Sequence, residues 1–192
     1  MKKILLLLII SAAARQAYCQ QTTLDIFNAE KQKINKNGFV VLASWSAANI
    51  IYGSIAASQS HGADKYFQQM NAMNSVTLGL SAFSYFTAKK DAGLSYEQSL
   101  KKQAGLEKIF LFNSGLDVAY IAGGFYLKEK AKNTIKNTDK LIGYGKSVVL
   151  QGSALLLFDA VMYILHNRHG KQLYHKIKLA STADGIGVLV KL

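Results

Sequence analysis

Two aspartates stand in long apolar stretches of the sequence, and their chemistry is the most unusual in the chain. Asp117 lies within the run FNSGLDVAYIAGGFYL, and Asp159 lies between Lys146 and Arg168. Neither stretch contains a lysine or an arginine. A buried ionised carboxylate without a basic neighbour is costly. We therefore expect each carboxyl to be neutral and hydrogen-bonded, or to face a water-filled cavity.

Other polar side chains recur at helical spacing around these two acids. Asn113 and Tyr120 fall on the same helix stripe as Asp117, and Tyr163 follows Asp159 by one helical turn, so a phenol can reach an acid in each helix. The sequence predicts an inward-facing polar seam, in which the two carboxyls are offset by roughly 4 to 8 Å along their helices at 1.5 Å per residue. The seam candidates are Asn49, Asn113, Asp117, Tyr120, Gln151, Asp159 and Tyr163.

Two interpretations of the seam stay open. Buried amides, hydroxyls and phenols hold membrane helices together at about 0.6 to 2 kcal/mol per hydrogen bond, so the seam can be purely structural. The alternative is a functional site, either a proton relay or a small-ligand pocket. Two acids retained without a basic partner favour this second interpretation.

Segregation of the charges predicts the architecture. Charged residues make up 18% of the sequence and hydrophobic residues 50%, and there is no proline. Four stretches of about 19 to 27 residues contain at most one charge, and an α-helix of this length crosses a hydrocarbon core of roughly 30 Å. We predict an all-α fold, a four-helix transmembrane bundle over residues 38–166. Its predicted spans are Gly38–Ser58, Met70–Ala88, Ile109–Leu127 and Lys146–His166.

Residues 1–19 have the features of a secretory signal peptide. Two lysines precede a short apolar run, and Ala17 and Cys19 occupy positions −3 and −1 of a cleavage site before Gln20. An uncleaved signal anchor is the alternative. Residues 20–37 are predicted to form an amphipathic segment on the membrane surface, with its lysines toward lipid phosphates.

The connecting segments carry local signals. Ser95 and Gln98 form a capping box that predicts a short interfacial helix, and Gly105 is predicted to end it. The tail, residues 167–192, is predicted to contain a short β-hairpin, because β-branched residues follow a turn signal at Asp184.

Export of the N-terminus predicts a multi-pass protein of the bacterial inner membrane with both termini in the periplasm. The lysine-rich loops 89–108 and 128–146 must lie on opposite sides, so the positive-inside rule does not decide the orientation. The octets SVTLGLSA and SVVLQGSA, in the second and fourth spans, indicate either a tandem duplication or a chance match.

The remaining function classes have little support in the sequence. No motif for a catalytic triad or a phosphate-binding loop occurs, so we predict that the chain is not an enzyme and has no cofactor. His166 and His169 have a spacing that a metal site can use, but no nearby carboxylate or cysteine completes a ligand set. Lysine-rich loops are typical of contact with anionic lipid and not of nucleic-acid binding. The expected partners are membrane lipids, and a homo-oligomer if the chain transports a solute.

The motifs GLDVAY and QGSALLLFDAVMY contain Asp117, Tyr120, Gln151, Asp159 and Tyr163. With their surroundings from Gly38 to His166, they resemble a family of small bacterial membrane proteins of unknown function. The resemblance implies a signal peptide and four spans, and it implies no activity. The sequence therefore predicts an uncharacterised membrane protein with a structural or interaction role. The alternative is a small-ligand or proton-handling membrane protein, for transport or sensing.

Overall fold

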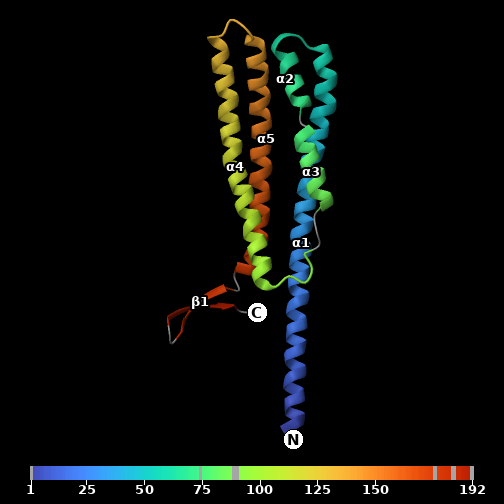
Figure 1. The fold of residues 1–192 in the computed structure, drawn as a ribbon, viewed down its shortest axis with the longest axis vertical. Helices are drawn as coiled ribbons and strands as arrows, with labels where there is room; N and C mark the ends of the chain where they lie inside the picture. Colours follow the sequence, from blue (N-terminus) through green and yellow to red (C-terminus); the bar gives the residue numbers. More distant parts are fainter. Residues whose placement is uncertain (1, 74, 88–90, 175–176, 183–184, 191–192) are drawn as a thin grey trace.

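Five helices and two strands make up the described part of the chain, which is seen in a computed structural model. The structure describes residues 2–73, 75–87, 91–174, 177–182 and 185–190. Along one long axis, α1 runs up, α2 and α3 run down in succession, α4 runs up and α5 runs down (Figure 1). They are α1 (Lys2–Gln59), α2 (Gly62–Ala72), α3 (Ser75–Thr87), α4 (Tyr96–Lys132) and α5 (Thr138–Tyr174).

The second predicted span, Met70–Ala88, is not a single helix. α2 ends at Ala72 and α3 begins at Ser75. The two helices have different packing partners. α2 packs against both α1 and α5, whereas α3 packs against α1. With 13 residues, α3 is about 20 Å long at 1.5 Å per residue, which is shorter than a hydrocarbon core. The prediction of four continuous spanning helices is therefore wrong for this segment.

The other helices are longer than predicted. α1 continues without a break through the predicted cleavage site before Gln20, so it gives no support to a boundary there. α4 begins at the predicted capping box, where Ser95 Oγ accepts a hydrogen bond from the backbone N–H of Gln98. It does not end at Gly105 but continues to Lys132. One glycine inside a helix costs only about 1 kcal/mol, less than the packing of buried residues on both sides of it contributes.

Two helices in the described residues are long and apolar enough to cross a membrane, Thr22–Gln59 and Thr138–Tyr174. Only 11% and 17% of their most apolar stretches are buried. The core helix of a soluble protein would be mostly buried over such a stretch. These helices therefore give weak support to a membrane location.

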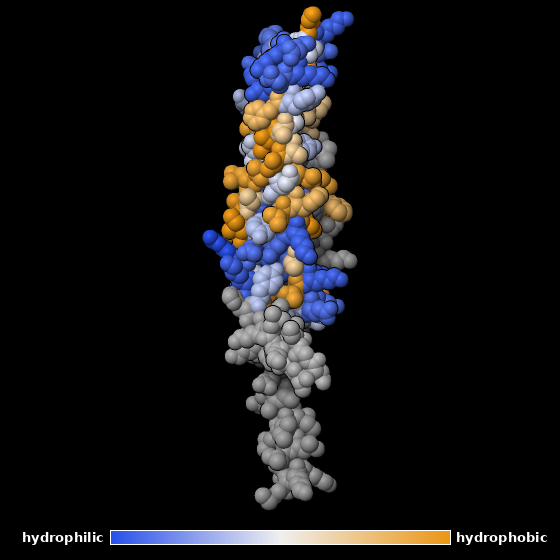
Figure 2. All heavy atoms as spheres, turned by 90° about the vertical axis from the view of Figure 1, so that its left-hand side faces the viewer, coloured by the Kyte–Doolittle hydropathy of each residue, from blue (hydrophilic) through white to orange (hydrophobic). Residues whose placement is uncertain are grey.

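The interior of the bundle is polar and its surface is apolar. Fourteen of the described buried side chains are polar or charged, and five are hydrophobic. On the α4 side an apolar belt separates two hydrophilic zones (Figure 2). Large apolar side chains at the surface of α4 include Phe112 and Phe125, which are 68% and 52% exposed. The distribution is the reverse of that in a soluble domain.

The close contact between α4 and α5 depends on glycine. A Cβ atom at Gly124 would lie 2.7 Å from a methyl group of Val149 and 2.9 Å from the carbonyl oxygen of Gly145. A Cβ at Gly145 would in turn lie 2.7 Å from the carbonyl oxygen of Gly124. The two backbones can approach this closely only because both positions lack a side chain.

Two short strands follow α5. They are β1 (Ile177–Thr182) and β2 (Gly185–Val190), paired antiparallel with Ile177 opposite Val190 and Thr182 opposite Gly185. The predicted turn residue Asp184 lies outside the described residues.

Candidate functional site

The two aspartates meet between α4 and α5. Asp117 is 6% exposed and Asp159 is 5% exposed. Their carboxyl groups lie close enough to interact with each other, and Asn113 also interacts with Asp159. We define Asp117 and Asp159 as the carboxyl pair. The offset predicted along the helices thus does not keep the two carboxyls apart.

The direction of helical side chains explains how carboxyls on offset positions of two helices come together. Each Cα–Cβ bond in a helix tilts toward the N-terminus of its own helix. Because α4 and α5 are antiparallel, the side chains of the carboxyl pair lean toward each other and close the offset between their backbones. Gly152 brings the helices together at this level, since a Cβ there would lie 3.3 Å from the Asp117 carbonyl oxygen.

The carboxyl pair is suited to holding a single proton. A hydrogen bond between two carboxyl groups needs a proton on one of them, because an ionised carboxylate is only an acceptor. Oδ2 of Asp117 is buried and has no hydrogen-bond partner within the described part of the chain. The arrangement can therefore accept or release a proton, and one of its oxygen atoms is left available.

The two tyrosines of the predicted seam do not join the carboxyl pair. Tyr120 is 58% exposed, so its side chain lies at the surface of α4 and not in the interior beside Asp117. Tyr163 is half-buried, and the described residues include no hydrogen bond from it to either acid. The assignment of Tyr120 to the seam is wrong.

Asn49 and Gln151 belong to a separate group farther along the bundle. Gln151 accepts a hydrogen bond from the indole N–H of Trp45 at 3.0 Å and donates to Asn49 Oδ1 at 3.1 Å and to Asn71 Oδ1 at 2.9 Å. Ser147 donates to Asn71 as well. These five residues, the amide cluster, join α1, α2 and α5. The single predicted seam is thus two groups between different helices.

Sequence reasoning missed a third group at the end of the bundle where α4 begins. Lys31 of α1 is completely buried, and its ammonium donates to Asn28 Oδ1 at 2.8 Å and pairs with Asp91 Oδ2 at 2.9 Å. Asn28 donates to Ser99 Oγ at 2.8 Å, and Lys102 also binds Asp91. We call these five residues the basal ion cluster.

Lys31 therefore contradicts the prediction that the lysines of residues 20–37 all face lipid phosphates. Asn28, Lys31 and Asn35 lie at positions i, i+3 and i+7 of α1, which is one helix face. That polar stripe is the sequence signal that could have revealed the buried cluster.

Electrostatics at Asp91 favour its ionised form. Burial alone would raise the pKa of this carboxyl, but hydrogen bonds from Lys102, Lys31 and Gln32 lower the pKa below its usual value. Asp91 is thus the anion that compensates the buried Lys31 ammonium. A buried ammonium without such a partner would be strongly unfavourable.

Both candidate metal ligands are engaged in hydrogen bonds. His166 Nε2 lies 2.8 Å from Asn35 Oδ1, and His169 Nε2 lies 3.0 Å from the carbonyl oxygen of Phe27. The described residues contain no group of three or more His, Cys, Asp or Glu side chains that could hold a metal ion. These contacts connect α5 to α1 beside the basal ion cluster.

Comparison with protein families finds a match to a family of unknown function. The family of unknown function DUF6992 matches residues 41–160, a segment that contains the carboxyl pair and the amide cluster. No curated protein and no solved structure matches the chain. The family match covers more than half of the 192 residues. The chain therefore belongs to this family of unknown function.

Proposed function

We propose that the chain is an integral membrane protein with a structural or interaction role, held together by its buried polar groups. The reversed distribution of side chains is the observation that supports this best. Polar residues such as Gln103 and Lys31 have no exposed surface, while Phe112 and Leu157 are each 68% exposed. An apolar surface of this extent is unfavourable in water but is solvated by lipid tails.

The proposed topology is multi-pass. Residues 38–58, 109–127 and 146–166 cross the bilayer, and α2 with α3 returns the chain between the first two of these. Both termini then lie on one side, which we assign to the periplasm of a bacterial inner membrane, with residues 1–19 as the export signal. Membrane lipids are the direct partners of the apolar belt.

In this role the polar groups act as interhelical contacts. The amide cluster joins α1 and α2 to α5, and the carboxyl pair joins α4 to α5. Each such hydrogen bond contributes about 0.6 to 2 kcal/mol to helix association in membranes. The outward-facing surface of α4 is then free to contact lipid or other membrane proteins.

A second candidate function is proton or small-ligand handling at the carboxyl pair. It is favoured by two buried acids that interact with each other and by Oδ2 of Asp117, which has no hydrogen-bond partner among the described residues. Transport would require a homo-oligomer, because four helical segments make a narrow bundle. The absence of proline from the chain disfavours the broken-helix sites of many transporters.

Matched substitutions of the carboxyl pair separate the two functions. Asp117→Asn and Asp159→Asn retain hydrogen-bonding capacity, whereas Asp117→Leu and Asp159→Leu remove it. The readouts are the amount of folded protein by size-exclusion chromatography and proton uptake by proteoliposomes loaded with a pH-sensitive dye.

The structural role predicts no dye response in any protein and a loss of folded protein in the leucine variants. A dye response of the wild type that disappears in fully folded asparagine variants would refute a purely structural role and establish proton handling.

A further inference from the structure

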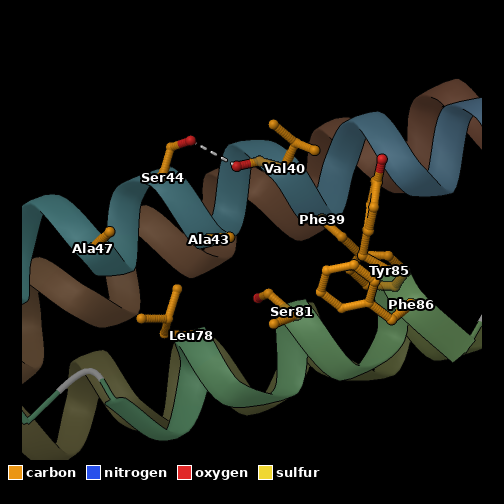
Figure 3. Close-up of a pocket in the computed structure, with 10 residues that line it drawn as sticks. Phe39, Val40, Ala43, Ser44, Ala47, Leu78, Ser81, Tyr85 and Phe86 are labelled. Carbon is orange, nitrogen blue, oxygen red and sulfur yellow. Dashed lines mark hydrogen bonds between the residues drawn. The ribbon is translucent and has the colours of Figure 1, made fainter.

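An apolar groove runs between α1 and α3. It extends along α1 from Phe39 to Ala47, a distance of about 12 Å at 1.5 Å per residue. Its volume is about 350 Å³. Small residues including Ala43 form its floor, and the rings of Tyr85 and Phe86 stand at one end (Figure 3). The groove is narrow and open at the protein surface.

The polar side chains that line the groove are two serines and, at the end next to the basic cavity, the Tyr85 phenol. Ser44 Oγ donates a hydrogen bond to the carbonyl oxygen of Val40 at 2.8 Å, and Ser81 Oγ donates to that of Thr77 at 2.7 Å. Both donors are thus used within their own helices. The groove therefore suits an alkyl chain and not a polar molecule.

A basic cavity adjoins the end of the groove that holds the aromatic rings. This cavity has a volume of about 560 Å³ and shares Val40 and Tyr85 with the groove as lining residues. It is also lined by Lys33 and Lys36, and the ammonium of Lys36 lies 5.5 Å from the centre of the Tyr85 ring. The two sites form one continuous surface, apolar at one end and cationic at the other.

The acids that line this cavity are already engaged. Asp91 is paired with Lys31 and Lys102, and Asp25 accepts a hydrogen bond from the backbone N–H of Gly93 at 2.8 Å. Lys33 and Lys36 form no ion pair with any described residue. Asp91 is matched by Lys31 and Lys102, and Lys33 with Lys36 outweighs the single carboxylate of Asp25, so the cavity presents net positive charge to an incoming anion.

We propose that this surface binds one anionic phospholipid, with an acyl chain in the α1–α3 groove and the phosphate at Lys33 and Lys36. The inference rests on the proposed membrane location, in which the first span begins at Gly38. Lys33 and Lys36 then lie at the level of the headgroups, and the groove lies at the level of the acyl chains. Charge and polarity along the surface thus follow those of a phospholipid.

Native mass spectrometry of the full chain, released from nanodiscs of mixed phosphatidylglycerol and phosphatidylcholine, tests the proposal. The wild type should retain one phosphatidylglycerol in preference to phosphatidylcholine. Lys33→Gln with Lys36→Gln should weaken this retention about 30-fold, since a lysine near an anionic lipid contributes about 1 kcal/mol and 1.4 kcal/mol is a factor of ten.

Two further variants complete the test. Lys101→Gln with Lys108→Gln removes the same charge from exposed positions of α4 outside the site, and should leave retention unchanged. Ala43→Phe fills the groove and should reduce the retention of phosphatidylglycerol while the cationic cavity stays intact. Far-ultraviolet circular dichroism checks that each variant is folded.

Equal retention by the two double-lysine variants would overturn the proposal, as would undiminished retention by a folded Ala43→Phe variant. A change from dimer to monomer in Ala43→Phe, with lipid retention unaffected, would assign the groove to a second copy of the chain. A wild type that is recovered in the membrane fraction but retains no phosphatidylglycerol would refute this inference alone and leave the proposed membrane location standing.

Discussion

Replacing Asp91 by asparagine should destabilise the protein more than replacing its buried partner Lys31 by methionine. In the Asp91→Asn variant, Lys31 stays fully buried as an ammonium that faces a neutral amide. Removing one member of a buried ion pair costs about 3 to 5 kcal/mol, because the other charge is left uncompensated. Since Asn28 still accepts a hydrogen bond from Lys31, we expect a loss of about 3 kcal/mol, at the lower end of this range.

The Lys31→Met variant leaves a different situation. Asp91 keeps Lys102 and Gln32 as partners, so no uncompensated charge remains. The variant loses chiefly the hydrogen bond to Asn28, a cost of about 1 kcal/mol. The double variant should therefore recover about 2 kcal/mol of the loss caused by Asp91→Asn alone.

Reversible unfolding in mixed detergent micelles measures these differences. The fluorescence of Trp45, the one tryptophan of the chain, reports the transition. Equal costs for Asp91→Asn and Lys31→Met, added together in the double variant, would refute the idea that Asp91 compensates a buried charge.

Three other predictions concern pH, helix packing and the amide cluster. Because the folded pKa of Asp91 lies below its unfolded value, the stabilising effect of Asp91 is present above about pH 4 and is lost as pH falls through the folded pKa. The wild type should therefore be more stable than Asp91→Asn at pH 7, and the difference between their free energies of unfolding should shrink as the pH is lowered below about 4. Gly124→Ala should lower the free energy of unfolding by about 1 to 3 kcal/mol, because the added methyl group overpacks the contact between α4 and α5. Gly123 has open space around it, so Gly123→Ala should leave the free energy of unfolding unchanged or raise it by up to about 1 kcal/mol in the same assay. Gln151→Leu leaves the Trp45 indole N–H without its acceptor, so the emission should shift to the blue and stability should fall by about 1 to 3 kcal/mol; an unchanged spectrum would contradict the hydrogen bond.

Helix positions could be predicted from the sequence where a single local pattern determines them. Long uncharged stretches correctly predicted helix over Gly38–Ser58, Ile109–Leu127 and Lys146–His166, and the capping box of Ser95 and Gln98 predicted where α4 begins. These features are local, because they depend on hydropathy and on hydrogen bonds between residues close in the chain.

The contacts between helices could not be predicted from the same patterns. Helical spacing placed Asp117 and Asp159 on inward faces, but their meeting depends on how α4 and α5 are aligned by Gly124, Gly145 and Gly152. The sorting of Asn49 and Gln151 into a separate cluster depends on the position of α2, which brings Asn71 to them. These arrangements are set by packing between distant segments.

The burial of Lys31 shows a further limit of prediction from sequence. Lysine near a membrane surface is usually solvated, so its type and position favoured exposure. Its burial depends on Asp91, which is brought to it by the connection between α3 and α4. No spacing rule on one helix can identify a partner supplied by a distant loop.

Extraction of isolated membranes with alkaline carbonate tests the central claim that lipid solvates the apolar surface of this bundle. We predict that the full chain stays in the membrane pellet and leaves it only with detergent. Recovery of a compact, monomeric chain in the detergent-free supernatant would contradict the account.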